Sequence, residues 1–94
     1  MKFLALEKEL KAEAEYYPGI LKQEAKRVLE LYEVGVIREI YFDGNNYTAV
    51  IILECKDAEE SNRILNSLPL VKEKLITFEI IPLIPYNGFS RLSQ

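Results

Sequence analysis

The order of apolar and polar positions divides the 94-residue chain into six segments. Short β-branched and aromatic runs predict strands, whereas apolar residues that recur every three or four positions predict helices. The predicted strands are Lys2–Glu7, Val36–Asp43, Tyr47–Glu54 and Leu75–Pro82, and the predicted helices lie between Pro18 and Gly35 and between Asp57 and Pro69. This order predicts an α+β, ferredoxin-like βαββαβ sandwich, formed by a single domain over residues 1–94.

Residues at the segment ends support the two predicted helices. Pro18 is expected early in the first helix and Gly35 just past its end. Asp57 and Glu60 have the spacing of a capping box at the start of the second helix, and Pro69 is expected to stop that helix. The apolar stripe predicted for the first helix consists of Leu21, Ala25, Val28, Leu29 and Tyr32.

The sequence Gly44-Asn45-Asn46 predicts a tight hairpin between the two central strands, because Gly and Asn tolerate a positive φ. Closure around Gly44 and Asn45 would place Tyr41 opposite Thr48 and sort the side chains onto two faces. The face expected under the helices holds Arg38, Ile40, Phe42, Tyr47, Ala49, Ile51 and Leu53. The mixed face holds Ile37, Glu39, Tyr41, Thr48, Val50, Ile52 and Glu54.

A two-layer sandwich leaves this mixed face open to water. Exposure of Ile37, Val50 and Ile52 would forgo about 1.5–3 kcal/mol for each side chain, so a homodimer packed sheet to sheet is expected. The extended C-terminal tail, residues 83–94, is also too apolar for a free end. The tail either reaches a neighbouring subunit or folds back over the edge of its own sheet.

Composition and charge exclude several classes of protein. The net charge of −3 and the pI near 5.0 argue against a nucleic-acid partner. With one cysteine, Cys55, and no histidine, the chain has no internal disulfide, cysteine-based zinc site or Ser–His–Asp triad. We expect no metal, cofactor or membrane partner and a cytoplasmic location. Cys55 is expected to be buried, and Glu7 and Glu54, at strand ends, to be solvated.

Two carboxylates are the candidate general bases. Glu39 and Glu79 would both lie on the mixed face, where partly apolar surroundings disfavour the charged form of a carboxylate. Tyr41 or Thr48 would donate a hydrogen bond to a substrate carbonyl oxygen, and Arg38 would hold a substrate carboxylate. The alternative is that these residues are paired or solvated polar groups at a dimer interface.

Several short motifs accompany this predicted topology. The sequence Ser67-Leu68-Pro69-Leu70 ends the second helix, Glu79 and Pro82-Leu83 follow in the last strand, and Gly35 precedes Arg38 at the helix-to-strand connection. With these motifs, the chain from about Leu31 to Leu83 resembles the muconolactone isomerase-like family. The resemblance implies a dimeric α/β barrel, in which two ferredoxin-like sheets face each other, and higher oligomers built from such dimers.

Two hypotheses for the function follow. The resemblance implies a cofactor-free isomerase that moves a proton in a small unsaturated lactone or acid. The alternative is a non-catalytic oligomeric module that binds or senses a small molecule in the same cavity.

Overall fold

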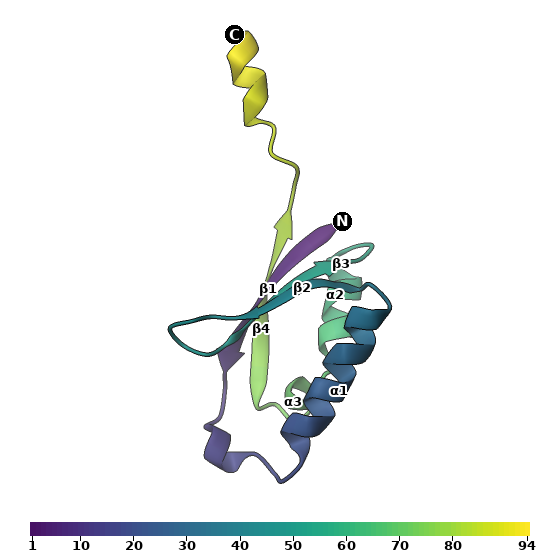
Figure 1. Cartoon of the computed structure of the whole chain (residues 1–94), viewed down its shortest axis with the longest axis vertical. Coiled ribbons are helices and arrows are strands. Elements are labelled where there is room, and N and C mark those ends of the chain that lie inside the picture. The colour runs from purple at the N-terminus through teal and green to yellow at the C-terminus, as the bar shows by residue number, and fades with distance from the viewer.

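The computed structural model describes residues 1–94 and contains one antiparallel sheet with the strand order β2-β3-β1-β4. The helices of the body lie together on one side of this sheet (Figure 1). The elements are β1 (Lys2–Glu9), η1 (Glu13–Glu15), α1 (Ile20–Glu33), β2 (Ile37–Phe42), β3 (Ala49–Glu54), α2 (Ala58–Leu65), α3 (Pro69–Lys72), β4 (Ile76–Leu83) and η2 (Gly88–Ser93). The predicted α+β, ferredoxin-like fold is confirmed.

The ends of α1 use two glycines in the left-handed region. Gly19 is the N-cap residue with φ 88°, and Gly35 lies just past the C-cap with φ 83°. A side chain is strained in this region, so glycine is favoured at both positions. Pro18 precedes the N-cap and belongs to the turn before the helix, not to the helix itself.

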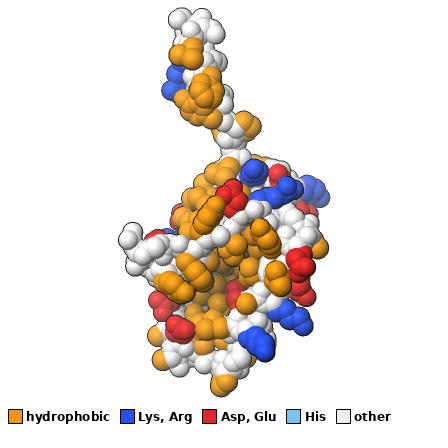
Figure 2. Space-filling view, in the orientation of Figure 1, with side chains coloured by type: hydrophobic (Ala, Val, Ile, Leu, Met, Phe, Trp, Pro, Cys, Tyr) orange, Lys and Arg blue, Asp and Glu red, His pale blue; other side chains and the backbone are white.

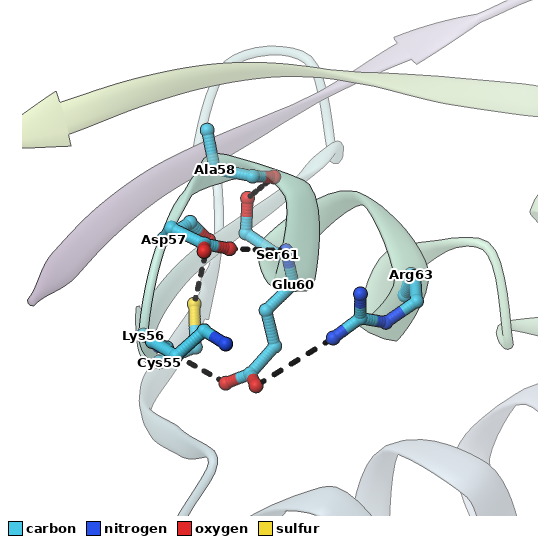
Figure 3. Close-up of polar contacts among 7 residues, drawn as sticks. All are labelled: Cys55, Lys56, Asp57, Ala58, Glu60, Ser61 and Arg63. Carbon is cyan, nitrogen blue, oxygen red and sulfur yellow. Dashed lines mark hydrogen bonds and ion pairs between the residues drawn. The ribbon is translucent and has the colours of Figure 1, made fainter.

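The start of α2 confirms the capping pattern. The carboxylate of Asp57 accepts a hydrogen bond from the Glu60 N–H at 2.8 Å, and Glu60 Oε1 accepts one from the Lys56 N–H at 3.0 Å (Figure 3). Pro69 does more than end a helix, because it is the first residue of the short helix α3, which the sequence did not predict. Proline suits this position, where an N–H would have no intrahelical partner.

The core lies between the helices and one face of the sheet. Its largest cluster joins buried side chains of β1, β2 and β3 to α1 and to the segment around α2: Phe3, Ala5, Leu31, Ile37, Ile51, Leu53, Cys55, Leu65 and Leu68. A smaller cluster near the start of α1 holds Ile20, Leu70, Leu75 and Ile76.

The turn between β2 and β3 contains more residues than the sequence predicted. Tyr41 pairs with Val50 instead of Thr48, and the Asp43 N–H donates to the Thr48 carbonyl at 2.7 Å. The observed pairing differs from the predicted one by two positions along β3. Because a shift of two positions leaves the alternation unchanged, Tyr41 and Val50 keep their predicted face.

The hairpin turn is held by a side chain. The Asp43 carboxylate accepts hydrogen bonds from the N–H groups of Asn45 and Asn46, at 2.8 and 3.3 Å. These bonds lower the pKa of Asp43. The positive φ falls on Tyr47, at 58°, and not on Gly44 as expected.

At the start of β2, a β-bulge places two side chains on the opposite faces from those predicted. Ile37 pairs with Leu53, but Glu39 pairs with Ile52, so Arg38 is an extra residue on this strand. An extra residue reverses the alternation of side chains before it. Ile37, predicted on the mixed face, is therefore in the core with 1% of its surface exposed, and Arg38, predicted under the helices, is exposed.

The tail leaves the body after Leu83 and ends in η2, well away from the sheet (Figure 1). Its apolar side chains Ile84, Tyr86, Phe89 and Leu92 are exposed. The alternative in which the tail folds back over its own sheet edge is therefore wrong for this structure. None of the helices is long and apolar enough to cross a membrane.

Candidate functional site

The helices leave the mixed face of the sheet uncovered, and we call it the open face. There the structure brings together two of the predicted site residues. The Tyr41 hydroxyl donates a hydrogen bond to Glu39 Oε1 at 2.7 Å, and this bond raises the pKa of Tyr41. Glu79 lies in β4 at the opposite edge of the sheet, where it forms an ion pair with Lys8 at 3.6 Å. Two strands separate the two glutamates, a distance of about 14 Å across the sheet. Glu39, Tyr41 and Glu79 are all exposed.

The remaining two predicted residues lie apart from each other. Thr48 lines a cleft of about 340 Å³ where β1 separates from the hairpin, together with Glu7 and Ala49. Arg38 is at the other end of β2, beside Glu54. The pKa of Glu54 is lowered by its hydrogen bond to the N-terminal ammonium group and, to a smaller extent, by Arg38.

The inward face of α1 differs from the predicted stripe and carries a carboxylate. Ile20 and Leu31 are buried, and Glu24 and Val28 between them are half-buried. In contrast, the predicted core residues Leu21, Leu29 and Tyr32 are exposed, Leu29 to 55%. The helix is rotated so that a second apolar stripe faces solvent and Glu24 lies on the inward side, against α3.

Glu24 connects α1 to α3. Its Oε1 accepts a hydrogen bond from the Leu70 N–H at 3.0 Å. Burial raises the pKa of Glu24, the Leu70 N–H opposes this shift, and the carboxylate of Glu7 raises the pKa further. Desolvation thus favours the protonated form of Glu24.

Glu7 was expected to be solvated, but it is half-buried on the face that the helices cover. The reason is that β1 continues to Glu9, and Glu7 pairs with Phe78 on the same face as Ala5. Its Oε1 accepts a hydrogen bond from the Ala49 N–H at 3.0 Å. Glu7 therefore holds β3 near β1 at the point where their ladder ends.

Two exposed aromatic side chains, Phe42 and Tyr47, belong to the hairpin beside Ala49. Ala49 pairs with Phe42, and the Phe42 ring stacks on Tyr47 with ring centroids 4.4 Å apart and planes 12° apart. Figure 2 shows a hollow between the hairpin and α1, ringed by apolar side chains, with acidic side-chain atoms inside. We use the name acidic hollow for Glu7, Tyr16 and Glu24, whose ionisable groups influence one another, together with Phe42 and Tyr47 of the adjoining hairpin.

The pKa of Tyr16 is affected by the negative charges of the acidic hollow. Tyr16 packs against the smaller core cluster below α1. Burial raises the pKa of Tyr16, and four carboxylates raise it further: Glu7, Glu9, Glu13 and Glu24. The Tyr16 hydroxyl therefore stays protonated as a hydrogen-bond donor in a region of negative potential.

Sequence reasoning missed Glu7 and Glu24 although a signal was present. Glu24 stands four residues after Ile20 and four before Val28, on one helical stripe with both. Glu7 continues the alternation of Phe3 and Ala5. A carboxylate that occupies a position of the apolar repeat points to the same side as the core residues. Packing of other elements on that side can then exclude water from it.

Neither the single cysteine nor the remaining carboxylates form a second candidate site of this kind. Cys55 is buried, its Sγ lies 3.7 Å from the Asp57 carbonyl oxygen, and burial raises its pKa (Figure 3). This disfavours the thiolate and confirms Cys55 as a buried side chain. No group of three or more Cys, Asp or Glu side chains is placed to hold a metal ion.

Fold and site together define a ferredoxin-like α+β protein with an acidic hollow between its sheet and its first helix. A sequence model of the muconolactone delta-isomerase family matches residues 4–88, so the chain belongs to this family. A search of curated protein sequences found no match.

Two solved structures show the same fold at low sequence identity. The crystal structure of muconolactone isomerase at 3.3 Å resolution is 17% identical, with a TM-score of 0.76 over 94% of this chain and 93% of that one. The second is 5-chloro-2-hydroxyhydroquinone dehydrochlorinase from Burkholderia phenoliruptrix AC1100, in complex with 2,5-dihydroxybenzoquinone. It is 13% identical, with a TM-score of 0.61 over 94% of this chain and 98% of that one.

Proposed function

We propose that this member of the family is a cofactor-free isomerase that moves a proton within a small unsaturated lactone or a related oxygenated ring, in the acidic hollow. The observation that carries the proposal is Glu24. It is a half-buried carboxylate on the inward side of α1, and burial, with a smaller contribution from Glu7, raises its pKa. The names of the two solved relatives support the substrate class, since each refers to a small oxygen-bearing unsaturated ring.

The residues of the acidic hollow divide the reaction between them. Glu24 takes a proton from a carbon next to the substrate carbonyl, and the electron pair of that C–H bond passes into the conjugated system as an enolate. The Tyr16 hydroxyl donates a hydrogen bond to the carbonyl oxygen as it becomes negative. Glu24 then returns the proton to another carbon of the same system, so no atom or electron is gained or lost.

The other side chains position the substrate. The stacked rings of Phe42 and Tyr47 present apolar surface to a flat ring. Glu7 is fixed by the Ala49 N–H, and its charge adds to the rise in the pKa of Glu24 that burial causes. Fixed groups of this kind contribute to rate because they need no reorientation during the reaction.

The open face is the second candidate site. Its specific support is the 2.7 Å hydrogen bond from Tyr41 to Glu39, which pairs a hydroxyl donor with a possible base. In this proposal Glu39 or Glu79 moves the proton, Tyr41 or Thr48 orients the carbonyl, and Arg38 holds a substrate carboxylate. Apart from the half-buried Thr48, these side chains are exposed in one copy, so the site would be enclosed only between two sheets.

We also propose that the chain forms a homodimer through this open face, with higher assembly through the tail. Leu4, Leu6, Val50 and Ile52 are only half-buried there, and Ile81 and Leu83 are exposed. Light scattering at micromolar concentration should give a dimer or larger species, and deletion of residues 84–94 should reduce the assembly. A monomer for the intact chain contradicts this proposal.

Proton NMR in D₂O tests the isomerase and locates its base. Muconolactone and related unsaturated lactones are incubated with the protein, and exchange of the proton next to the carbonyl is followed. Glu24→Gln should slow exchange about 10²- to 10⁴-fold, the range for loss of a general base. Glu33→Gln, an exposed site on the same helix, is the matched control.

The outcomes separate the hypotheses. Loss of exchange in Glu39→Gln or Glu79→Gln, with Glu24→Gln unchanged, moves the reaction to the open face. Binding without exchange by the wild-type protein favours the non-catalytic binding module.

A further inference from the structure

We propose that the outward side of α1 is a contact surface for a second copy of this chain, which packs its own α1 against it in an antiparallel, two-fold arrangement. The surface is the apolar stripe that the sequence assigned to the core and the structure leaves in solvent. It consists of Leu21, Ala25, Leu29 and Tyr32. None of these residues belongs to the acidic hollow or to the open face, so the contact is separate from both.

The four side chains form one strip along the helix. With 3.6 residues per turn, they fall within roughly a quarter of the circumference of α1. Figure 1 shows that α1 runs along one side of the body. Leu21 is 49% exposed and Tyr32 is 53% exposed. Large apolar side chains on one strip favour association, because contact with another apolar surface removes them from water.

The two halves of this surface have complementary shapes. The first half of α1 carries an open groove of about 630 Å³, lined by Gly19, Lys22, Gln23, Ala25, Lys26 and Leu29. The second half carries the exposed ring of Tyr32. Antiparallel packing places the ring of each copy over the groove of the other. A two-fold contact requires a surface of this kind, which is complementary to itself after rotation.

The charges on the outward side of α1 are also divided between its two halves. Lys22 and Lys26 lie in the first half, and Glu30 and Glu33 lie in the second half. An antiparallel pair of helices therefore brings the basic half of each copy against the acidic half of the other. A parallel pair would instead place like charges together.

One register satisfies the charges and the shapes together. Lys22 and Glu33 are exposed, and neither forms an ion pair within its own chain. When Lys22 of one copy faces Glu33 of the other, Gln23 in the groove faces Tyr32. In the same register Ala25 faces Glu30, and its short side chain allows the two helices to approach closely. Each of these contacts occurs twice because of the two-fold symmetry.

A second α1 fits this surface better than the apolar tail does. Among residues 84–94 the only charged side chain is Arg91, so the tail offers no acidic side chain to the lysines beside the groove. The acidic half of another α1 does so. A pair of 14-residue helices is a small interface beside the roughly 800 Å² per partner of a typical stable complex. We therefore expect a contact that strengthens with protein concentration.

Cross-linking between cysteines tests the arrangement. Lys22→Cys and Glu33→Cys are made singly and together, and each protein is treated with a bis-maleimide that has an ethylene spacer. Positions 22 and 33 of one helix are about 16 Å apart, beyond the reach of this reagent within a chain. The double variant should form covalent dimers and each single variant far fewer. The wild-type protein, with its buried Cys55, gives the background.

Substitutions in the groove test its role by light scattering. Ala25→Glu fills the groove and faces Glu30 of the second copy, so the apparent mass should fall at least about twofold. Introduced into the double-cysteine protein, Ala25→Glu should also remove most of the cross-linked dimer. Ala58→Glu, the same change at an exposed position of α2, is the matched control, and circular dichroism checks that both variants are folded.

A charge exchange tests the register. Lys22→Glu should weaken the assembly, because it places two acidic side chains opposite each other. Lys22→Glu combined with Glu33→Lys should restore it, because the pair is formed again with its ends exchanged. Weakening without restoration would contradict the proposed pairing.

The remaining outcomes separate this contact from the alternatives. Equal cross-linking in the Lys22→Cys single variant and the double variant would overturn the antiparallel arrangement. Absence of cross-linked dimers would overturn the contact itself. Wild-type assembly in Ala25→Glu, with loss of assembly on deletion of residues 84–94, would assign the contact to the tail instead. None of these measurements uses proton exchange, so the isomerase and the α1 contact can fail independently.

Discussion

Replacement of Glu24 by alanine or glutamine separates the hydrogen bond of this side chain from its charge. Glu24→Ala removes the acceptor of the Leu70 N–H, which lies in the first turn of the four-residue helix α3. A hydrogen bond to a charged group contributes about 1.5–3 kcal/mol. Relief of the desolvated charge and of the repulsion from Glu7 offsets part of this loss. We expect a net destabilisation of about 1 kcal/mol, or about 4–8 °C in Tm for a domain of this size.

Glu24→Gln keeps an acceptor oxygen and removes the charge. Because burial raises the pKa of Glu24 above its ordinary value of 4.5, the protonated carboxyl is the form that favours folding. Its contribution is present below the ordinary pKa and is lost as the pH rises through the pKa in the folded protein. Glu24→Gln should therefore be at least as stable as the wild type near neutral pH, and this relative gain should shrink in acid.

Urea unfolding followed by circular dichroism measures both effects. The free energy of unfolding is compared at about pH 4 and about pH 7, at one protein concentration, with equal m-values as the requirement for comparison. The lowered pKa values of Asp43 and Glu54 affect wild type and variants alike, so they cancel in the difference.

Two results would refute this reasoning. Wild-type stability in Glu24→Ala would show that the Leu70 N–H does not depend on this carboxylate. A Glu24→Gln protein that is less stable near neutral pH and recovers in acid would show that the ionised form favours folding.

Three further predictions test the fold around the site. Ile37→Ala should cost about 2–5 kcal/mol in urea unfolding, because the bulge places Ile37 in the core; a loss below about 0.5 kcal/mol would fit an exposed residue. Asp57→Ala should cost about 1 kcal/mol through loss of the α2 cap, with Asp57→Asn close to wild type as the control; equal losses in both would argue against capping. Cys55 should react with a thiol reagent far more slowly in the folded protein than in urea, because the side chain is buried and its pKa is raised; equal rates would contradict this.

Local patterns predicted the element order because they depend on neighbours in sequence. The capping residues of α2, the glycine after α1 and the β-branched run of β3 each specify a local backbone state. The inward positions of Ile51 and Leu53 were also correct, because a shift of two residues in the hairpin preserves each face. The motifs near Pro69 indicated the family that the comparison confirmed.

The side of α1 that packs against the sheet was not predictable from local patterns. The helix carries one apolar stripe through Leu21 and Leu29 and another through Ile20 and Leu31. Periodicity identifies both stripes equally, and the choice depends on which one meets the sheet when the connections to β1 and β2 close. The bulge at Arg38 similarly depends on the pairing of β2 with β3 and not on β2 alone.

By itself the sequence determined the βαββαβ order, the family and the residues available for chemistry. Only the tertiary structure decided that Glu24 and Glu7 lie together, near Leu70 and Ala49, while Glu39 and Glu79 lie on opposite edges of the sheet. The physical reason is desolvation. A carboxylate changes its pKa when elements distant in sequence exclude water from it, and no local pattern records that approach.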